Sequence, residues 1–500
     1  MKKINYVILS LIIALGVSSC DNTDFGDIND NPNGTMEPNP SGLLAGAIME
    51  YATITGRDYL NRPTLYVQYQ SQVTYTTESR YSENQASWYA YYVTILENLQ
   101  QVISYAENPD NQGVDLNNQG APENQIGVAK IMEAVVMKRV TDTYGDVPFS
   151  EGFAGLDNLT PAYDKQEDIY KTLISQVKEA RDMMDESAAG PTGDILLDGN
   201  ITKWKKFANS LLLQMSLQLS NQFPDPSGYA ATEFNAALTD PNGVLEEVND
   251  EPWFKYQNLA SFQNPWTGNR TRDYFLSAEF VDALQGDDTE YNPTSNHTFD
   301  SRLSVYARST TKEGVPYGYA GESGAGKNQM SIYFWDYKNF TSPLPAFTAS
   351  YTYLMRAEAG AIGWTSEDAQ AMLTTGIEKS YATLDYHYGT DISGDAEAYA
   401  TARLADAASV GILQVIGEEK WVALYGQGFD AWAEWRRTGF PNLTPATDFL
   451  NSGEIPTRYD YPSEESGLNS SNYATGVSGL TPAEDVNTSH VWWDVPYPFD

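Results

Sequence analysis

The segment LQVIGEEKWVALYGQGFDAWAEWRRTGFP, residues 413–441, carries the strongest helical signal in the chain. Its large apolar residues recur three or four positions apart, which is the spacing of one face of an α-helix. These residues are Trp421, Leu424, Tyr425, Trp432 and Trp435. The pattern predicts one amphipathic helix that is weakened at Gly426 and Gly428 and ended by Gly439 and Pro441. Aromatic stripes at this spacing usually pack into a core, so we expect the stripe to be buried.

Outward from this segment, the chain divides by composition. Residues 41–220 and 346–441 show repeated helical spacing and predict a mainly α fold built from helical hairpins, although no clean 34-residue repeat is present. Residues 221–345 are rich in Gly, Pro, Asn, Asp and aromatic residues and predict a loop-rich insertion. Residues 442–500 are rich in turn residues and carry Trp492 and Trp493, so we expect this tail to dock on the body.

The N-terminus has the features of a lipoprotein signal. Lys2 and Lys3 precede an apolar run over residues 6–17, followed by small residues and Cys20, the only cysteine of the chain. The run is too short to span a bilayer. We therefore expect a signal peptide at 1–19, lipidation of Cys20 and a polar tether over 20–40. The alternative is an ordinary secretory signal with a chance cysteine.

The charge balance excludes some partners. The 500 residues carry a formal net charge of −37. A nucleic acid would be repelled by such a chain, and adsorption to anionic lipid through a basic patch is equally disfavoured.

Several segments resemble the SusD/RagB-like outer-membrane lipoproteins of Bacteroidetes, including the SusD-like, starch-binding-associated branch. These segments follow one another in the same order as in that family, and they extend from near the lipidation site to the C-terminus. The segments are FGDINDNPNG (25–34), TDTYGDVPFSE (141–151), WKKFANSLLLQMSLQLS (204–220), ASYTYLMRAEAGAIGW (349–364), KWVALYGQGFDAWAEWRRTGFP (420–441) and VWWD (491–494).

The resemblance implies a right-handed tetratricopeptide-like (TPR-like) superhelix with the loop-rich insertion. It also implies an outer-membrane lipoprotein that faces the cell exterior and lacks catalysis. Such a protein would capture a nutrient, an oligosaccharide or a peptide, and deliver it to a SusC-like TonB-dependent transporter. A scaffold that only stabilises the transporter is a further possibility.

Aromatic residues are the candidate ligand contacts, because rings stack on the apolar faces of sugars. We expect them first in the insertion and second between Tyr75 and Trp88. The candidates are Trp266, Trp335, Trp253, Tyr256, Tyr333, Tyr75, Tyr81 and Trp88. The alternative for each ring is that it packs the insertion onto the helices.

Catalytic and cofactor motifs are weak. The three histidines, His297, His387 and His490, form no metal-binding motif. The segment GESGAGK at 321–327 mimics a phosphate-binding loop, but it lacks a preceding buried strand and a following hydroxyl residue. No cofactor or metal is expected, although an all-oxygen calcium site would leave little trace. A surface hydrolase with two carboxylates remains the alternative, since 67 acidic residues prevent its exclusion by inspection.

Overall fold

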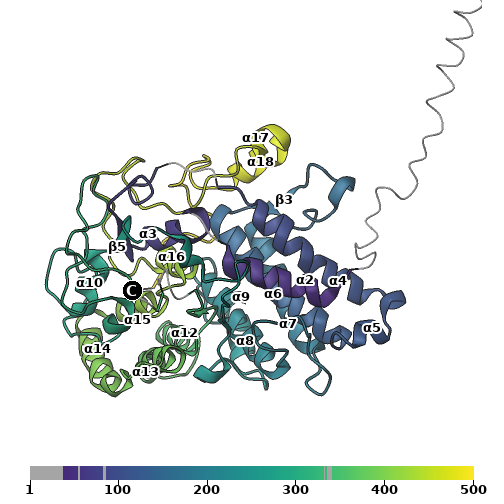
Figure 1. Cartoon of the computed structure of the whole chain (residues 1–500), viewed down its shortest axis with the longest axis horizontal. Helices are drawn as coiled ribbons and strands as arrows, with labels where there is room; N and C mark the ends of the chain where they lie inside the picture. Colours follow the sequence, from purple (N-terminus) through teal and green to yellow (C-terminus); the bar gives the residue numbers. More distant parts are fainter. Residues whose placement is uncertain (1–37, 55–56, 83–85, 332, 335–339, 500) are drawn as a thin grey trace, which may run out of the picture. The chain divides into compact units, whose positions relative to one another are not determined.

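The computed structural model describes residues 38–54, 57–82, 86–331, 333–334 and 340–499. The predicted signal peptide, most of the tether, Cys20 and Trp335 lie outside these residues. Everything below concerns the compact unit that begins at Pro40 (Figure 1).

The predicted mainly α fold is confirmed, because helices dominate the described part of this unit. The longer ones are α2 (Pro40–Thr53), α4 (Glu97–Glu107), α6 (Pro122–Tyr144), α7 (Gln166–Met183), α8 (Ile201–Gln218), α9 (Tyr229–Leu238), α10 (Ala278–Gln285), α12 (Ala349–Ala361), α13 (Ala369–Tyr388), α14 (Ala396–Val410), α15 (Ile412–Ala423), α16 (Gly428–Thr438) and α18 (Ser470–Ser478). The shorter ones are α3 (Arg62–Tyr66), α5 (Val114–Asn117), α11 (Leu303–Tyr306) and α17 (Glu465–Leu468), with π-helical turns η2 (Arg57–Asn61) and η3 (Ala90–Leu96). Five 3₁₀ turns complete the set: η4 (Pro109–Asn111), η5 (Gly155–Asp157), η6 (Val248–Asp250), η7 (Pro265–Gly268) and η8 (Ser393–Asp395).

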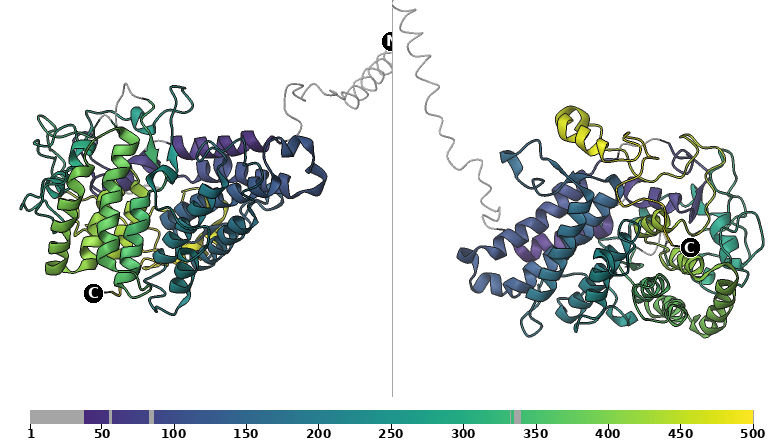
Figure 2. Two further views of the ribbon diagram at one scale, coloured as in Figure 1. Left: turned by 90° about the horizontal axis from the view of Figure 1, so that it is seen from below. Right: turned by 180° about the vertical axis from the view of Figure 1, so that it is seen from behind.

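Helices that follow one another in the chain pack as hairpins, notably α6 with α7, α8 with α9, α12 with α13 and α14 with α15. Figures 1 and 2 show two groups, one of purple to teal helices around α6 and one of green helices around α13. Contacts between α8 and α12 join the groups. The helix α9 lies inside the stretch predicted to be loop-rich, and it extends the hairpin series by pairing with α8.

Three small antiparallel sheets fasten distant segments together. Strand β1 (Gln70–Gln72) pairs with β5 (Tyr274–Leu276), and β2 (Val147–Pro148) pairs with β3 (Tyr163–Asp164). Strand β4 (Trp253–Phe254) pairs with β6 (Leu344–Pro345) and so brings an early part of the loop-rich region against its end. The segment around β1 is polar, yet Gln68, Gln70 and Gln72 are buried.

The prediction for residues 413–441 was right about burial for four of its five large residues, with Trp435 only partly buried, and wrong about continuity. Trp421, Leu424, Tyr425 and Trp432 are at most 2% exposed. The chain forms two helices, α15 and α16, because Gly426 adopts a φ of 93° that ends the first one. Gly428 then lies so close to α3 that a Cβ there would come within 2.7 Å of the Thr64 hydroxyl.

The same two helices bury charged side chains, which the sequence pattern did not indicate. Glu358 on α12 accepts two hydrogen bonds from Arg437, at 2.6 and 2.7 Å, and also pairs with Lys420. Glu434 bonds both cations, at 2.6 Å to Arg437 and 3.1 Å to Lys420. All four side chains are at most 6% exposed. Since each buried charge meets an opposite charge, this Glu358 cluster ties α12, α15 and α16 into one core.

A second buried cluster reaches the loop-rich region. Arg302 pairs with Asp300 and with Glu419 of α15, each at 2.7 Å, and all three side chains are at most 1% exposed. Glu419 also receives Arg403 of α14 at 2.8 Å. The neighbouring Glu418 accepts hydrogen bonds from the backbone and the hydroxyl of Ser295. The Glu419 cluster therefore fixes residues 295–302 against α14 and α15.

The C-terminal tail docks on the helices, as its tryptophans suggested. Trp493 is fully buried and donates a hydrogen bond from Nε1 to Asp142 at 2.8 Å. The Arg436 guanidinium lies 4.6 Å from its ring centroid. The Tyr497 hydroxyl bonds Glu358 at 2.8 Å, so the tail also contributes to the Glu358 cluster.

The Glu358 cluster gives a first prediction. The substitution Glu358→Gln should lower the free energy of unfolding by about 3 kcal/mol or more, because it leaves two buried cations with one carboxylate. Urea denaturation of the purified protein measures this change. The matched control Glu167→Gln removes a partner of the exposed Lys171 and should cost no more than about 0.5 kcal/mol. Equal stability of the two variants would contradict a stabilising role for the cluster.

Candidate functional site

Four of the predicted ligand residues lie in the core. Trp253 and Trp266 are each 1% exposed, Tyr256 is 5% exposed and Tyr81 is fully buried. Trp253 stacks on His387 with ring centroids 3.7 Å apart, and the Tyr256 hydroxyl donates to the backbone oxygen of Ala52 at 2.7 Å. A ring without an accessible face cannot stack on a sugar, so in this conformation these four side chains serve packing.

The other predicted residues differ in their surroundings. Tyr75 is 59% exposed and lies under the Arg270 guanidinium, at 5.4 Å from the ring centroid. Trp88 is partly buried in a cluster of rings, with Tyr144 at 5.3 Å. Tyr333 is partly buried beside Tyr388 at 5.2 Å. Of this set, Tyr75 alone presents most of its ring to solvent.

An open groove lies on the loop-rich region, and none of the seven predicted residues that the structure describes lines it. It consists of two adjoining hollows of about 490 and 200 Å³ that share Glu290 and Tyr291. One wall comes from α10 and the loop that follows it. The opposite wall comes from residues 313–319 and 442–447. We call it the Tyr291 groove.

The lining of the Tyr291 groove combines rings with polar groups. Tyr291 and Tyr319 are both partly exposed, and Asn442 and Thr444 lie at the rim of the smaller hollow. The larger hollow is lined by carboxylates, including Asp282, and by the Lys327 ammonium. Exposed rings beside hydrogen-bonding side chains are the arrangement that suits a hydroxylated ligand with an apolar face.

Hydrogen bonds from side chains and backbone hold the loops of the groove in place. Asn292 donates to the backbone oxygens of Asp287 and Asn296, both at 3.0 Å, and so closes the turn that carries Tyr291. The backbone nitrogen of Asn442 donates to Pro293 at 3.1 Å. The Glu418–Ser295 bonds described above fix the end of the same turn. Tyr291 is therefore presented by a loop that is tied at several points.

The opposite wall depends on a close backbone approach. Gly318 has a φ of 77°, and a Cβ there would come within 2.4 Å of Ala446. This contact lets the backbone nitrogen of Asp448 donate to Gly318 at 3.0 Å, while its carboxylate accepts from the Ala320 nitrogen at 2.7 Å. Tyr319 is placed at the groove by this pairing.

The Tyr75–Trp88 region packs against the side of this wall that faces away from the groove. Arg80 donates from Nε to the backbone oxygen of Asp448 at 2.6 Å, and the Tyr81 hydroxyl accepts from the Ala446 nitrogen at 3.0 Å. The two regions expected to carry ligand contacts are thus joined through residues 446–450. Tyr81 supports the groove wall and does not line it.

The carboxylates of the groove are electrostatically perturbed. Burial raises the pKa of Glu279 to about 8, so this side chain is largely protonated at neutral pH. One of its oxygens accepts from the Tyr317 backbone nitrogen at 3.2 Å. Burial also raises the pKa of Asp282, which accepts from the Thr289 hydroxyl at 2.6 Å. The part of the chain that the structure describes holds no cluster of three or more His, Cys, Asp or Glu side chains arranged to bind a metal ion.

The sequence contains a signal for this site that residue type alone did not reveal. Tyr291 lies in the run Glu290–Pro293, where a single ring stands among turn-forming polar residues and has no helical or strand partner. Such a ring has no apolar neighbours in sequence to pack with. The tryptophans of the insertion looked more promising because of their size, but large rings are also the ones that a core recruits.

Gly318 gives a second prediction. The substitution Gly318→Ala should lower the free energy of unfolding by about 1–2 kcal/mol, because an L-residue is strained at positive φ and its Cβ clashes with Ala446. Gly321→Ala is the matched control on the same loop, since a Cβ at Gly321 meets no atom within 4 Å. Thermal or urea unfolding compares the two variants. If Gly318→Ala is as stable as Gly321→Ala, the close approach does not hold the wall.

Sequence comparison identifies the family. A family model described as "Starch-binding associating with outer membrane" matches residues 32–462, which is most of the chain. No match was found among curated protein sequences.

Within the described ranges, no helix combines the length and apolar character that a membrane crossing requires.

Solved structures share the fold over almost the whole chain. A chitin-binding protein is 26% identical, with a TM-score of 0.76 over 92% of this chain and 100% of that one. A chitin-binding SusD homologue from Flavobacterium johnsoniae is 21% identical, with a TM-score of 0.74 over 92% and 99%. A SusD-like protein from Bacteroides thetaiotaomicron is 19% identical, with a TM-score of 0.72 over 92% and 99%.

These comparisons agree with the hairpin packing and with the sequence resemblance. The fold is the mainly α, TPR-like architecture of SusD-like structures. The chain therefore belongs to the SusD-like family of nutrient- and glycan-binding outer-membrane proteins.

Proposed function

We propose that this protein captures an oligosaccharide in the Tyr291 groove at the cell surface and delivers it to a SusC-like TonB-dependent transporter without cleaving it. The observation that carries the proposal is the groove itself. It is open and lies beside two partly exposed rings, Tyr291 and Tyr319, on loops that the helices hold in place. Pre-organised rings reduce the ordering cost of binding.

The chemistry of the groove favours a neutral glycan. Its larger hollow is lined by Asp282, Asp287, Glu290 and Glu313 against the single cation Lys327. These carboxylates would repel an acidic polysaccharide and would accept hydrogen bonds from sugar hydroxyls or amide N–H groups. The relative at 26% identity is a chitin-binding protein, so chitooligosaccharides are the first ligands to test. A peptide is the alternative ligand for the same groove.

The ligand prediction concerns the two rings. Tyr291→Ala and Tyr319→Ala should each weaken chitohexaose binding about five- to tenfold, because each removes one stacking contact worth about 1 kcal/mol. Isothermal titration with the purified protein measures the affinity. Tyr386→Ala is the control, since Tyr386 is 59% exposed on α13 and does not line the groove.

The titration panel also includes starch and xylan oligosaccharides and a peptide digest. Binding of one glycan class that both variants weaken supports the proposal and identifies the ligand. Wild-type affinity in both variants would show that the glycan binds elsewhere. Binding of peptides alone would replace the glycan with a peptide nutrient.

A hydrolase is the second candidate function, and one observation favours it. Glu279 has a raised pKa and lies near Asp282, which is how a glycosidase keeps one carboxyl as an acid beside a second carboxylate. Chromatography of the oligosaccharide after prolonged incubation separates the two functions. Recovery of intact ligand supports capture, whereas shortened products that disappear with Glu279→Gln would establish hydrolysis.

The anchoring prediction concerns Cys20, which we propose carries the lipid. Expressed in a Bacteroidetes host, Cys20→Ser should lose its association with the outer-membrane fraction, because a lipid chain and not a spanning helix would hold the protein there. Fractionation and immunoblotting measure the distribution, and Cys20→Ser that stays with the membrane would contradict a lipid anchor. Co-purification of a TonB-dependent transporter with the wild-type protein tests the proposed partner in the same preparation.

A further inference from the structure

A second cavity lies inside the helical body, away from the Tyr291 groove, and shares no lining residue with it. Its volume is about 90 Å³, and its walls come from α2, η2, α6, β4, β6 and the start of α16. Because a buried water needs roughly 10–15 Å³ of such volume, the cavity has room for about six to nine waters. This is the space of a small organic molecule.

Arg139 of α6 reaches into this cavity. Its guanidinium carbon lies 4.3 Å from the Tyr51 ring centroid and 4.8 Å from that of Phe429. Among the described residues, no carboxylate lies within ion-pair distance of it. An arginine is always charged, and a cation in such surroundings gains most from an anionic partner. Asp430 also lines the cavity and interacts electrostatically with Arg139, but the two described side chains form no ion pair. The guanidinium therefore has no directly bound anion.

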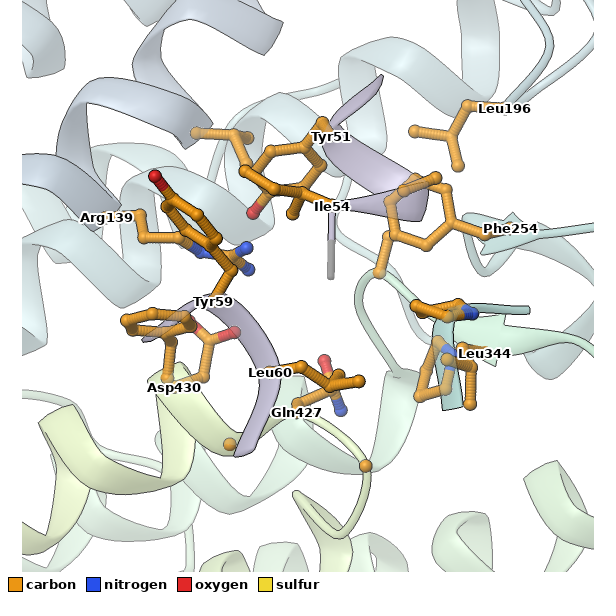
Figure 3. A pocket seen from close by; sticks show the side chains of 18 of the residues that line it. Tyr51, Ile54, Tyr59, Leu60, Arg139, Leu196, Phe254, Leu344, Gln427 and Asp430 are labelled. Atoms are coloured by element: carbon orange, nitrogen blue, oxygen red, sulfur yellow. The ribbon is translucent and has the colours of Figure 1, made fainter. Parts of the chain in front are cut away.

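Two more polar side chains, Gln427 and Asp430, line the cavity below Arg139 in the view of Figure 3. Gln427 is 8% exposed, and its Nε2 has no hydrogen-bond partner among the residues that the structure describes. Asp430 is engaged elsewhere, because it accepts from Gln214 at 2.9 Å and lies 3.9 Å from the Lys138 ammonium. A buried amide donor without a partner costs free energy unless something else accepts from it.

The remaining walls are apolar and rich in rings. Tyr51, Tyr59, Phe254 and Phe207 line the cavity together with aliphatic side chains such as Leu196. Figure 3 shows Tyr51 and Tyr59 beside the Arg139 guanidinium, with Phe254 and Leu344 on the far side. Flat rings on several sides suit a ring-sized body, and the charged group of that body would point to Arg139.

We infer that this cavity is a second binding site, which takes a small carboxylate with a ring-sized body. The carboxylate would pair with the Arg139 fork, which matches it in geometry, and the ring would lie among the aromatic walls. Gln427 would donate to a polar group of the same ligand. The inference does not depend on the proposed function, because it uses no residue of the Tyr291 groove.

Two kinds of molecule share this chemistry, a uronic acid and an aromatic acid. Isothermal titration of the purified protein therefore uses two matched pairs, glucuronate with glucose and benzoate with benzyl alcohol, in which the members differ at the carboxylate. We expect one acid to bind and its neutral counterpart to bind at least about tenfold more weakly. The acid that binds identifies the source of the ligand.

Variants locate the site. Arg139→Gln should weaken binding of the acid about tenfold or more, while Arg270→Gln, which removes an arginine stacked on the exposed Tyr75, should leave it unchanged. Asp430→Asn should strengthen binding several-fold, because it removes a competing negative charge and keeps an acceptor for Gln214. If Arg139→Gln fails to fold, the affinity of Asp430→Asn still shows whether the acid binds in this cavity.

Three outcomes would overturn the inference. They are binding of neither acid at millimolar concentration, equal binding of an acid and its neutral counterpart, and unchanged affinity in both Arg139→Gln and Asp430→Asn. Chitohexaose titration of the same variants should give wild-type values. This readout separates a failure of the cavity site from a failure of the groove.

Discussion

Three consecutive charged residues in the middle of α15 organise the molecule. Glu418, Glu419 and Lys420 are each 1% exposed, and together they pair with several distant parts of the chain. Glu418 holds Ser295 and Arg403, Glu419 holds Arg302 and Arg403, and Lys420 holds Glu358 and Glu434. Apolar contacts tolerate small shifts between helices, but a buried charge is costly unless its partner is in place. The helices around α15 consequently have one favourable arrangement.

The proposed binding surface depends on the same constraint. Loops that present ligand contacts need a rigid support, and the turn that carries Tyr291 obtains it from Glu418 through Ser295 and from Asn442 through Pro293. The Glu419 cluster fixes the residues that follow. Buried contacts in the interior therefore hold the loop-rich region in one conformation. Its own sequence, rich in Gly, Asn and Asp, would not adopt a defined structure alone.

The sequence predicted the features that follow local rules and missed those set by distant contacts. The burial of Trp421 and Trp432 followed from their spacing, and the α content followed from repeated periodicity. The break at Gly426 did not, because Phe334 and Thr64, which surround the break, come from distant parts of the chain. Burial of Glu358 and Lys420 was also hidden, since charged residues are solvated unless a partner 62 residues away reaches them. The exposure of the aromatic rings was hidden for the same reason. Trp266 and Tyr291 lie in the same loop-rich region, but core residues pack over Trp266 and leave Tyr291 partly exposed.

Beside the side chains of Asn292, Glu418 and Asp448, main-chain groups hold part of the frame of the Tyr291 groove. Asp448 donates to Gly318, Asn442 donates to Pro293 and Leu450 donates to Arg80, in each case from backbone nitrogen to backbone oxygen. A main-chain hydrogen bond is indifferent to the side chain that the residue bears, with Gly318 as the exception imposed by space. The lining positions, such as Tyr291, Tyr319 and Thr444, can therefore be exchanged while the frame persists. This separation makes the groove a scaffold whose lining can be re-engineered position by position.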